Sequence, residues 1–403
     1  MSPSYMTVDL NMGTDAKSLD TGRVDSCRPI YARNRFLPFE IVSLIASYMY
    51  ASHPALHACA LTCRLWKDAI YPHRFCQVVV TRESQLVDLL KFIETDKVKS
   101  VWVQEIVSTV PPQRMLLKMI NLAPHLPRVH TLEFRGLQRD AGADCAAVRK
   151  VFSQFISVET LRFRRSQLSL SVVQAAACAL PKLTCLEFEQ GGFNNDDDDH
   201  PFMSSSQRDR IRLKSLRVEK TQQCANFYGW ISSSDSQSTI QSFDVDGVDS
   251  GERLLESAGF IQALGSSLTH LGLLARRPRI DYFREATYKA TLKAINLESN
   301  SNIRSLEFYD PLHPGIISWL GQLPRPALLR SVVLHMPARD VSTSYAELDK
   351  YLTRPEFCNL KEVHIVYLRA LRAVDSMQIR QDLEAGFPAM AGRGLLKLTI
   401  SRV

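Results

Sequence analysis

The stretch that decides the fold is VHTLEF at residues 129–134, where apolar residues stand at the first, fourth and sixth places. Nine further copies follow it toward the C-terminus: VETLRF (158–163), LTCLEF (183–188), LKSLRV (213–218), IQSFDV (240–245), LTHLGL (268–273), IRSLEF (303–308), LRSVVL (329–334), LKEVHI (360–365) and LLKLTI (395–400). Successive copies start 25 to 35 residues apart, which is enough chain for one strand, one helix and two connections. The sequence therefore predicts an α/β fold built from repeated strand and helix units.

The repeat extends toward the N-terminus in a weaker form. VKSVWV (98–103) fits the same template, and CQVVV (76–80) predicts a degenerate first strand. Leu-Pro pairs at 126–127, 180–181 and 323–324 each stand just before a predicted strand, where proline ends a helix and the residue before it prefers extended backbone. We therefore expect about 11 to 12 strands in this part of the chain.

This pattern resembles leucine-rich repeats, whose L-x-x-L-x-L strands form one curved parallel sheet with helices on its convex side. The resemblance covers residues 76–403 and implies a solenoid. The Asn or Cys that the family usually carries three positions after the last apolar residue of the strand is missing, since Ser166, Gly191 and Thr221 stand there. Irregular repeats backed by helices are therefore expected rather than a regular horseshoe.

A second informative stretch, LPFEIVSLIASYMYASHPALHACALTCRLWKDAIYPHRF, covers residues 37–75 and predicts two or three short helices. Pro38 suits a first helical turn because proline has no N–H to leave unpaired there. Four apolar residues then recur at helical intervals: Ile41, Leu44, Ile45 and Tyr48. A unit of about 40 residues is usually too small to be stabilised by its own core, so its remaining apolar surface predicts a binding partner.

The same stretch resembles an F-box. The family pattern opens Leu-Pro-x-Glu-(Ile/Leu) and closes (Leu)-x-Cys-Arg-x-Trp, and residues 37–41 (LPFEI) and 61–66 (LTCRLW) match both ends, with Thr62 where many members carry an aliphatic residue. F-box proteins dock a Skp-type adaptor in Skp-cullin-F-box ubiquitin ligases, so the resemblance implies a non-catalytic substrate receptor in ubiquitin-dependent degradation. The adaptor contacts that it implies are Leu37, Pro38, Ile41, Ile45, Leu61 and Trp66.

Two alternatives to an adaptor site stay open for this unit. Its apolar residues can pack on the rest of the protein, as apolar helix faces usually do. The unit can also serve as the end cap of a repeat scaffold that never enters a ligase. Binding of an adaptor separates both alternatives from the F-box interpretation.

The surface opposite the core can be read from the repeats, because side chains alternate along a strand and the residue between the fourth and sixth places points outward. These residues form the first row: Glu133, Arg162, Glu187, Arg217, Asp244, Gly272, Glu307, Val333, His364 and Thr399. The outward residues two places later form the second row: Arg135, Arg164, Glu189, Glu219, Asp246, Leu274, Tyr309, His335, Val366 and Ser401. The first half of the first row alternates in charge, so neighbouring side chains are expected to neutralise one another.

The C-terminal third of this surface is the predicted substrate-binding site, because both rows become partly apolar and aromatic there. Its residues are Leu274, Tyr309, Val333, His335, His364 and Val366. An alternative is that flanking loops, especially residues 191–212, cover or replace this surface.

Composition and motifs argue against several other classes of function. The net charge of +7 is spread thinly over 403 residues, whereas nucleic-acid binding normally needs clustered Lys and Arg. The nine cysteines include no CxxC pair, which favours free thiols over disulfides or a zinc ribbon. No P-loop, G-x-G-x-x-G, G-x-S-x-G or H-E-x-x-H motif occurs, so we predict no enzyme, no catalytic residue, no cofactor and no metal site.

The remaining expectations concern location and partners. No apolar run is long enough to span a membrane, and the first thirty residues lack the apolar centre of a secretory signal. Residues 1–33 are predicted to be a disordered tail, and 34–75 and 76–403 the two structured parts. A cytoplasmic or nuclear location is expected. The expected partners are a Skp-type adaptor, through it a cullin, and an unidentified protein substrate, with no nucleic acid and no membrane.

Overall fold

The computed structural model describes most of the chain downstream of residue 37. The described residues are 38–49, 52–95, 100–109, 118–137, 144–194, 211–245, 251–273, 295–309, 315–337, 345–369 and 376–402. The predicted tail at 1–33 lies outside them, as do Leu37, Asp246 and Leu274.

Twelve strands form one parallel sheet in which every strand pairs with the next one along the chain. They are β1 (Gln77–Val80), β2 (Glu105–Ser108), β3 (Thr131–Arg135), β4 (Thr160–Arg164), β6 (Cys185–Glu189), β8 (Ser215–Glu219), β9 (Ser242–Val245), β10 (His270–Leu273), β11 (Ser305–Tyr309), β12 (Ser331–Pro337), β13 (Glu362–Arg369) and β14 (Leu396–Arg402). A short second sheet pairs β5 (Gln167–Ser169) with β7 (Gly192–Asn194). The predicted α/β fold with a long parallel sheet is therefore confirmed.

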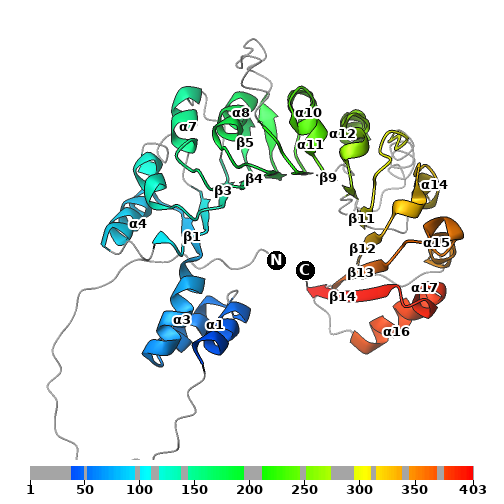
Figure 1. The fold of residues 1–403 in the computed structure, drawn as a ribbon, viewed down its shortest axis with the longest axis horizontal. Helices are drawn as coiled ribbons and strands as arrows, with labels where there is room; N and C mark the ends of the chain where they lie inside the picture. The colour runs from blue at the N-terminus through cyan, green and yellow to red at the C-terminus, as the bar shows by residue number, and fades with distance from the viewer. Residues whose placement is uncertain are drawn as a thin grey trace, which may run out of the picture.

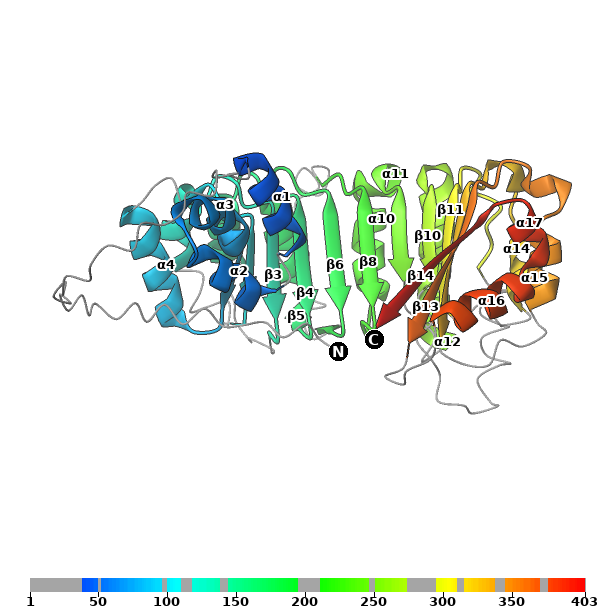
Figure 2. The ribbon, with the colours of Figure 1, turned by 90° about the horizontal axis from the view of Figure 1, so that it is seen from below.

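Helices alternate with these strands and lie on one side of the sheet. They are α4 (Glu83–Thr95), α7 (Cys145–Phe152), α8 (Leu170–Ala179), α10 (Ala225–Ser232), α11 (Ser236–Thr239), α12 (Gly251–Leu264), α14 (Gly315–Leu320), α15 (Tyr345–Leu352), α16 (Ser376–Gly386) and α17 (Pro388–Gly392). Figure 1 shows the strands along the inner side of an arc and the helices along its outer side. Seen from below, the strands run side by side in one direction (Figure 2). The inner face of the sheet is therefore left open by the helices.

The repeated apolar residues form the core between the sheet and the helices. Val129, Leu132 and Phe134, at the first, fourth and sixth places of the first clear copy, are all buried. Phe134 stacks on Phe163 of the next copy, with ring centroids 5.7 Å apart, and Phe163 stacks on Phe188 at 5.4 Å. Each unit thus buries part of its apolar face against its neighbours, which is why the repeat has to be continued along the chain.

Two details of the strands differ from the sequence prediction. Residues 100–103, the described part of VKSVWV (98–103), do not form a strand: a turn at 101–102 precedes β2, and buried Val103 occupies the first place of a copy whose fourth place is Ile106. At the other end, β14 begins at Leu396, two residues after the left-handed turn residue Gly394 (φ +67°), and Thr399 pairs with Val366 rather than with His364. In both places the alternation of strands and helices is as predicted, and only the residues that pair with the neighbouring strand differ from the prediction.

The turns after β4, β6 and β8 contain Ser166, Gly191 and Thr221, the positions where leucine-rich repeats usually carry Asn or Cys. Each begins with a residue of positive φ, namely Arg165, Gln190 or Lys220. Ser166 follows Arg165, and its buried hydroxyl oxygen accepts a hydrogen bond from the backbone N–H of Leu137 at 3.3 Å. At Gly191, a Cβ would lie 2.3 Å from the carbonyl oxygen of Ser166, so only glycine allows this close approach.

The N-terminal helical unit consists of α1 (Phe39–Tyr48), α2 (His53–Ala60) and α3 (Arg64–Phe75), and α1 and α2 each pack against α3. α1 begins directly after Pro38, whose carbonyl oxygen accepts the N–H of Val42 at 3.1 Å. The unit has a small core of its own, formed by Ala46, Leu56, Ala60 and Ile70 and separate from the core of the sheet. Figure 1 places it beyond the β1 end of the arc.

Aromatic side chains join this unit to the sheet. The Phe75 ring at the end of α3 lies 6.3 Å from the Trp102 ring and 5.1 Å from the Phe92 ring of α4, measured between centroids. Tyr71 meets Trp102 edge to face at 6.3 Å. Only Cys76 separates α3 from β1. Among the described residues, no helix combines the length and the apolar character that crossing a membrane requires.

Candidate functional site

Helix α1 is apolar on two sides, and the larger side chains lie on the side away from the unit's core. Val42 and Ala46 face inward and are fully buried. Four larger apolar side chains of α1 are exposed, and Ile45 is half-buried: the exposed ones are Phe39 (46%), Ile41 (41%), Leu44 (52%) and Tyr48 (82%). Because small residues face α3, α1 and α3 can approach each other closely. The larger residues stay exposed in the part of the chain that the structure describes.

This exposed surface is concentrated in the helical unit. Seven large apolar side chains are exposed among the described residues, and five belong to α1 or to the turn after α2, where Leu61 is 74% exposed. The other two, Ile156 and Met377, lie elsewhere in the chain. Single exposed apolar residues are ordinary, whereas a concentration of them on one small unit is typical of a protein-binding surface.

The residues predicted as adaptor contacts divide between this surface and the interior of the unit. Pro38, Ile41 and Leu61 are exposed, and Ile45 is half-buried. Trp66 is half-buried and packs against the unit's own core, so part of its ring stabilises the unit. The sixth predicted contact, Leu37, is the one outside the described residues. Sequence reasoning left Phe39, Leu44 and Tyr48 out of the contact set, although Leu44 and Tyr48 stand in the same periodic stripe.

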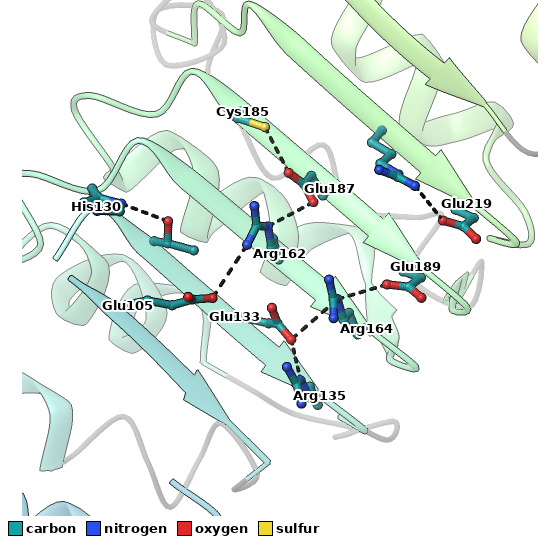
Figure 3. A network of polar contacts seen from close by, with 12 residues as sticks. Glu105, His130, Glu133, Arg135, Arg162, Arg164, Cys185, Glu187, Glu189 and Glu219 are labelled. Carbon is teal, nitrogen blue, oxygen red and sulfur yellow. Dashed lines mark hydrogen bonds and ion pairs between the residues drawn. The ribbon is translucent and has the colours of Figure 1, made fainter. Parts of the chain in front are cut away.

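The open face of the sheet carries a network of ion pairs in its N-terminal half (Figure 3). Arg162 contacts Glu187 at 2.9 Å and Glu105 at 3.6 Å, and Arg164 contacts Glu189 at 2.9 Å and Glu133 at 3.5 Å. The predicted alternation of charges in the first row is therefore confirmed in this half. Such lateral pairs contribute roughly 0.2 to 1 kcal/mol each where they stay accessible to water.

Glu133 is one of the two most enclosed acids of this network, together with Glu219. Only 2% of the Glu133 side chain is exposed, and it contacts Arg135 as well as Arg164. Burial tends to lower the pKa of the neighbouring Arg162, but the charges of Glu187, Glu105 and Glu133 outweigh it and raise that pKa. These arginines are therefore held by carboxylates on the sheet.

In the next strands of the same face, imidazoles take the place of the arginines. His270 Nε2 lies 3.0 Å from Asp244 Oδ1 and 3.9 Å from Glu307 Oε2. His335 Nε2 lies 2.7 Å from Glu307 Oε1. We call these four side chains, contributed by β9 to β12, the acid–imidazole cluster.

Two groups of the cluster have shifted pKa values. Burial tends to lower the pKa of His270, but the hydrogen bond and the charge of Asp244, helped by Glu307, outweigh it and raise the pKa. Burial tends to raise the pKa of Glu307, but the hydrogen bond and charge of His335, followed by His270, lower it. Each shift has its cause in the pairing of an acid with an imidazole across neighbouring strands.

Four of the six predicted substrate-binding residues lie together on β12 and β13 of this face, Tyr309 ends the neighbouring β11, and Leu274 lies outside the described residues. Val333 pairs with His364 and His335 with Val366, while the alternate residues of both strands are buried. The backbone of Tyr309 pairs with His335. His335 is less available than predicted, because only 12% of its side chain is exposed and Glu307 accepts its hydrogen bond. His364 is within hydrogen-bond distance of Thr399 Oγ1, at 2.8 Å.

Sequence reasoning missed the acid–imidazole cluster as a unit. Asp244, Gly272, Glu307 and His335 all stand in the predicted rows, but His270 lies two residues before the first row. The sequence did contain a signal: Gly272 stands between the acids Asp244 and Glu307 of the first row. Because glycine has no side chain, it leaves room for His270, the outward residue two places earlier on the same strand. Of the loop residues 191–212, which are the alternative cover for this face, 195–210 lie outside the described part of the chain, whereas Phe193 is buried in the core.

Comparison with known proteins adds no relative to these observations. No model of a known protein family matches the chain. None of the curated proteins compared with it is similar enough to count as a match. The resemblances to an F-box and to leucine-rich repeats therefore stay predictions that depend on the motifs quoted above.

Proposed function

We propose that this chain is the substrate-recognition subunit of a Skp-cullin-F-box ubiquitin ligase. In this proposal residues 34–75 are the F-box that docks the Skp-type adaptor, and residues 76–403 are a leucine-rich-repeat-like solenoid that holds the target. The observation that carries it is the exposed apolar surface of α1 on a unit that already has its own core. That surface belongs to the stretch that matches both ends of the F-box pattern.

Burial of this surface can supply the free energy of docking. Fully burying a Leu, Ile or Phe side chain contributes about 1.5 to 3 kcal/mol, and Phe39, Ile41 and Leu44 are each about half exposed. Covering the exposed parts of several such side chains contributes on the order of a few kcal/mol. Association costs about 4 to 15 kcal/mol, so the wider contact around these residues has to contribute as well.

The proposed role requires no catalytic group in this chain. The transfer of ubiquitin would be performed by other subunits, and this subunit would raise the local concentration of the target's lysines. The aromatic contacts of Phe75 and Tyr71 with Trp102 suit such a role, because they hold the adaptor-binding unit against the end of the sheet. The target would bind the open face of the sheet around β12 and β13.

Adaptor capture by purified protein tests the proposal. Ile41→Glu combined with Leu44→Glu places two charges in the proposed contact, and we expect it to abolish co-purification of the Skp-type adaptor. The matched control is Ile156→Glu with Met377→Glu, which makes the same change at two exposed apolar residues outside the unit. Loss of capture in the first variant and full capture in the control support the proposal. Equal capture by both variants refutes it.

A second candidate function has one observation in its favour. The rings of Tyr71 and Phe75 pack on Trp102 at the β1 end of the sheet, as an end cap of a repeat scaffold would. A scaffold outside any ligase predicts that even the wild-type chain fails to bind a Skp-type adaptor. Failure of the wild-type protein in the experiment above would therefore favour this alternative.

A further inference from the structure

The first row of the sheet contains a place where its charge pattern predicts a cation and the sequence has none. From Glu133 to Asp244, acids and arginines alternate from one strand to the next: Arg162 lies between Glu133 and Glu187, and Arg217 between Glu187 and Asp244. The strand after Asp244 places Gly272 in the row, and the strand after that places Glu307. Two carboxylates thus flank a position that has no side chain.

The acid–imidazole cluster fills the space above this glycine. Asp244 Oδ1 sits so close that a Cβ on residue 272 would lie 2.2 Å from it. His270, two residues earlier on the same strand, brings its Nε2 between the two carboxylates. One donor atom each from Asp244, His270 and Glu307 lies within 4.8 Å of the other two.

These distances suit a divalent metal ion. Zinc binds imidazole nitrogen and carboxylate oxygen at about 2.0 to 2.2 Å, so two donors on one ion are at most about 4.4 Å apart. A small rotation of the side chains brings the three donors within that limit. Imidazole with carboxylates is a donor set typical of zinc and neighbouring transition metals, whereas calcium and magnesium prefer oxygen alone.

Glu307 is already oriented for such a role. His335 Nε2 lies 2.7 Å from one of its carboxylate oxygens, Oε1, and the other oxygen, Oε2, is the one nearest His270. A metal-binding carboxylate is typically fixed in this way by a hydrogen bond from a second side chain. In the N-terminal half of the row the partners of the acids are guanidinium groups, which have no lone pair available for a metal.

We propose that Asp244, His270 and Glu307 form a site for one divalent transition-metal ion such as Zn²⁺, with His335 positioning Glu307. The ion replaces the missing cation of the first row and links β9, β10 and β11. A fourth ligand from water or from a bound protein completes the coordination. The inference does not depend on the proposed ligase function.

Titration of the full-length protein with Co²⁺, followed by competition with Zn²⁺, tests the proposal. We expect wild-type protein to bind one ion with a visible spectrum of Co²⁺ in a nitrogen and oxygen environment. Asp244→Asn removes the negative charge of one ligand, and His270→Gln removes the imidazole nitrogen of another. Each should weaken binding by at least about tenfold, since loss of a side chain that only supports a ligand already costs about 10- to 100-fold. Gly272→Ala should also weaken binding, since its Cβ displaces the Asp244 carboxylate without removing a donor.

Matched controls separate this site from general surface binding. Glu187→Gln removes a carboxylate of the same row, and His364→Gln removes an imidazole of the same face, both outside the cluster. Both should bind Co²⁺ like the wild type, and circular dichroism and melting curves should show that all variants are folded. The proposal is overturned by wild-type protein without one-to-one binding, by full binding in folded Asp244→Asn and His270→Gln, or by equal loss in the controls. A strong cobalt–thiolate charge-transfer band would also overturn it, because it would assign the ion to cysteine.

Discussion

The ring of Phe75, the last residue of α3, stacks on the ring of Trp102 with 6.3 Å between centroids and 21° between planes. Phe75 belongs to the helical unit, whereas Trp102 lies three residues before β2. Together with Tyr71 and Phe92, this contact joins the helical unit to α4 and to the β1 end of the sheet. The direction in which the unit projects from the sheet is therefore set by side-chain packing as well as by the connection through Cys76.

Trp102→Ala should loosen this junction without unfolding either part. The variant loses two aromatic contacts, each contributing about 0.5 to 1.5 kcal/mol beyond the buried area. We expect faster limited proteolysis around residue 76 and unchanged adaptor capture, because the exposed surface of α1 is not altered. Trp102→Phe, which keeps a ring, is the control. Cleavage of Trp102→Ala at the wild-type rate would show that the junction is held by other contacts.

Substitutions in the core and on the exposed surface of the helical unit should differ sharply in their effect on stability. Leu56 is fully buried in the unit's core, so Leu56→Ala should destabilise the unit by about 2 to 5 kcal/mol. Leu44 is half exposed, and Leu44→Ala should change stability by less than about 0.5 kcal/mol. Urea unfolding followed by circular dichroism measures both. A large loss in Leu44→Ala would mean that this side chain is covered within the chain.

Glu133→Gln should cost more stability than the same change at Glu189. Glu133 is almost completely buried between Arg135 and Arg164, and hydrogen bonds to charged groups contribute about 1.5 to 3 kcal/mol each. Glu189 contacts Arg164 at 2.9 Å but is 31% exposed, so Glu189→Gln should cost less than about 1 kcal/mol. The free energy of unfolding measures both changes. Equal losses would contradict the role of burial.

The cysteine thiols should differ in their reaction with iodoacetamide. Burial, assisted by the charge of Glu187, raises the pKa of Cys185 to about 12, and burial raises the pKa of Cys178 to about 11. Because the thiolate is the reacting species, both should be modified much more slowly at pH 8 than the exposed Cys63 and Cys358. Their rates should rise as the pH approaches 11. Mass spectrometry of labelled peptides measures this order, and modification of Cys185 as fast as Cys63 at pH 8 would contradict it.

The sheet could be predicted from the sequence because its signal is local. The first, fourth and sixth places of each copy bury residues such as Val129, Leu132 and Phe134, and their spacing fixes both the strand and its outward face. The template failed at 98–103, where all three of its places are apolar, because the strand is formed by the later segment 103–108, which has Ile106 at its fourth place but Ser108 at its sixth. Apolar spacing alone therefore favours the wrong register here.

The candidate sites were less predictable because they depend on which of several suitable side chains are covered. Helix α1 has one apolar stripe through Ile41 and Leu44 and another through Val42 and Ala46, and periodicity does not indicate which one packs on α3. The small residues face inward because they allow the helices to approach. The acid–imidazole cluster forms because Gly272 has no side chain and leaves room for His270 to contact Asp244. This proximity is visible only in the folded structure.

The in-register charges of the first row also limit how such a chain can gain or lose repeats. Deleting the unit that contains Arg162 would bring Glu133 opposite Glu187, and like charges directly opposite each other are destabilising. Deleting two consecutive units, those of Arg162 and Glu187, would place Glu133 beside Arg217 and restore the alternation. Shortening or lengthening of this protein, in evolution or by engineering, should therefore be tolerated best in steps of two units.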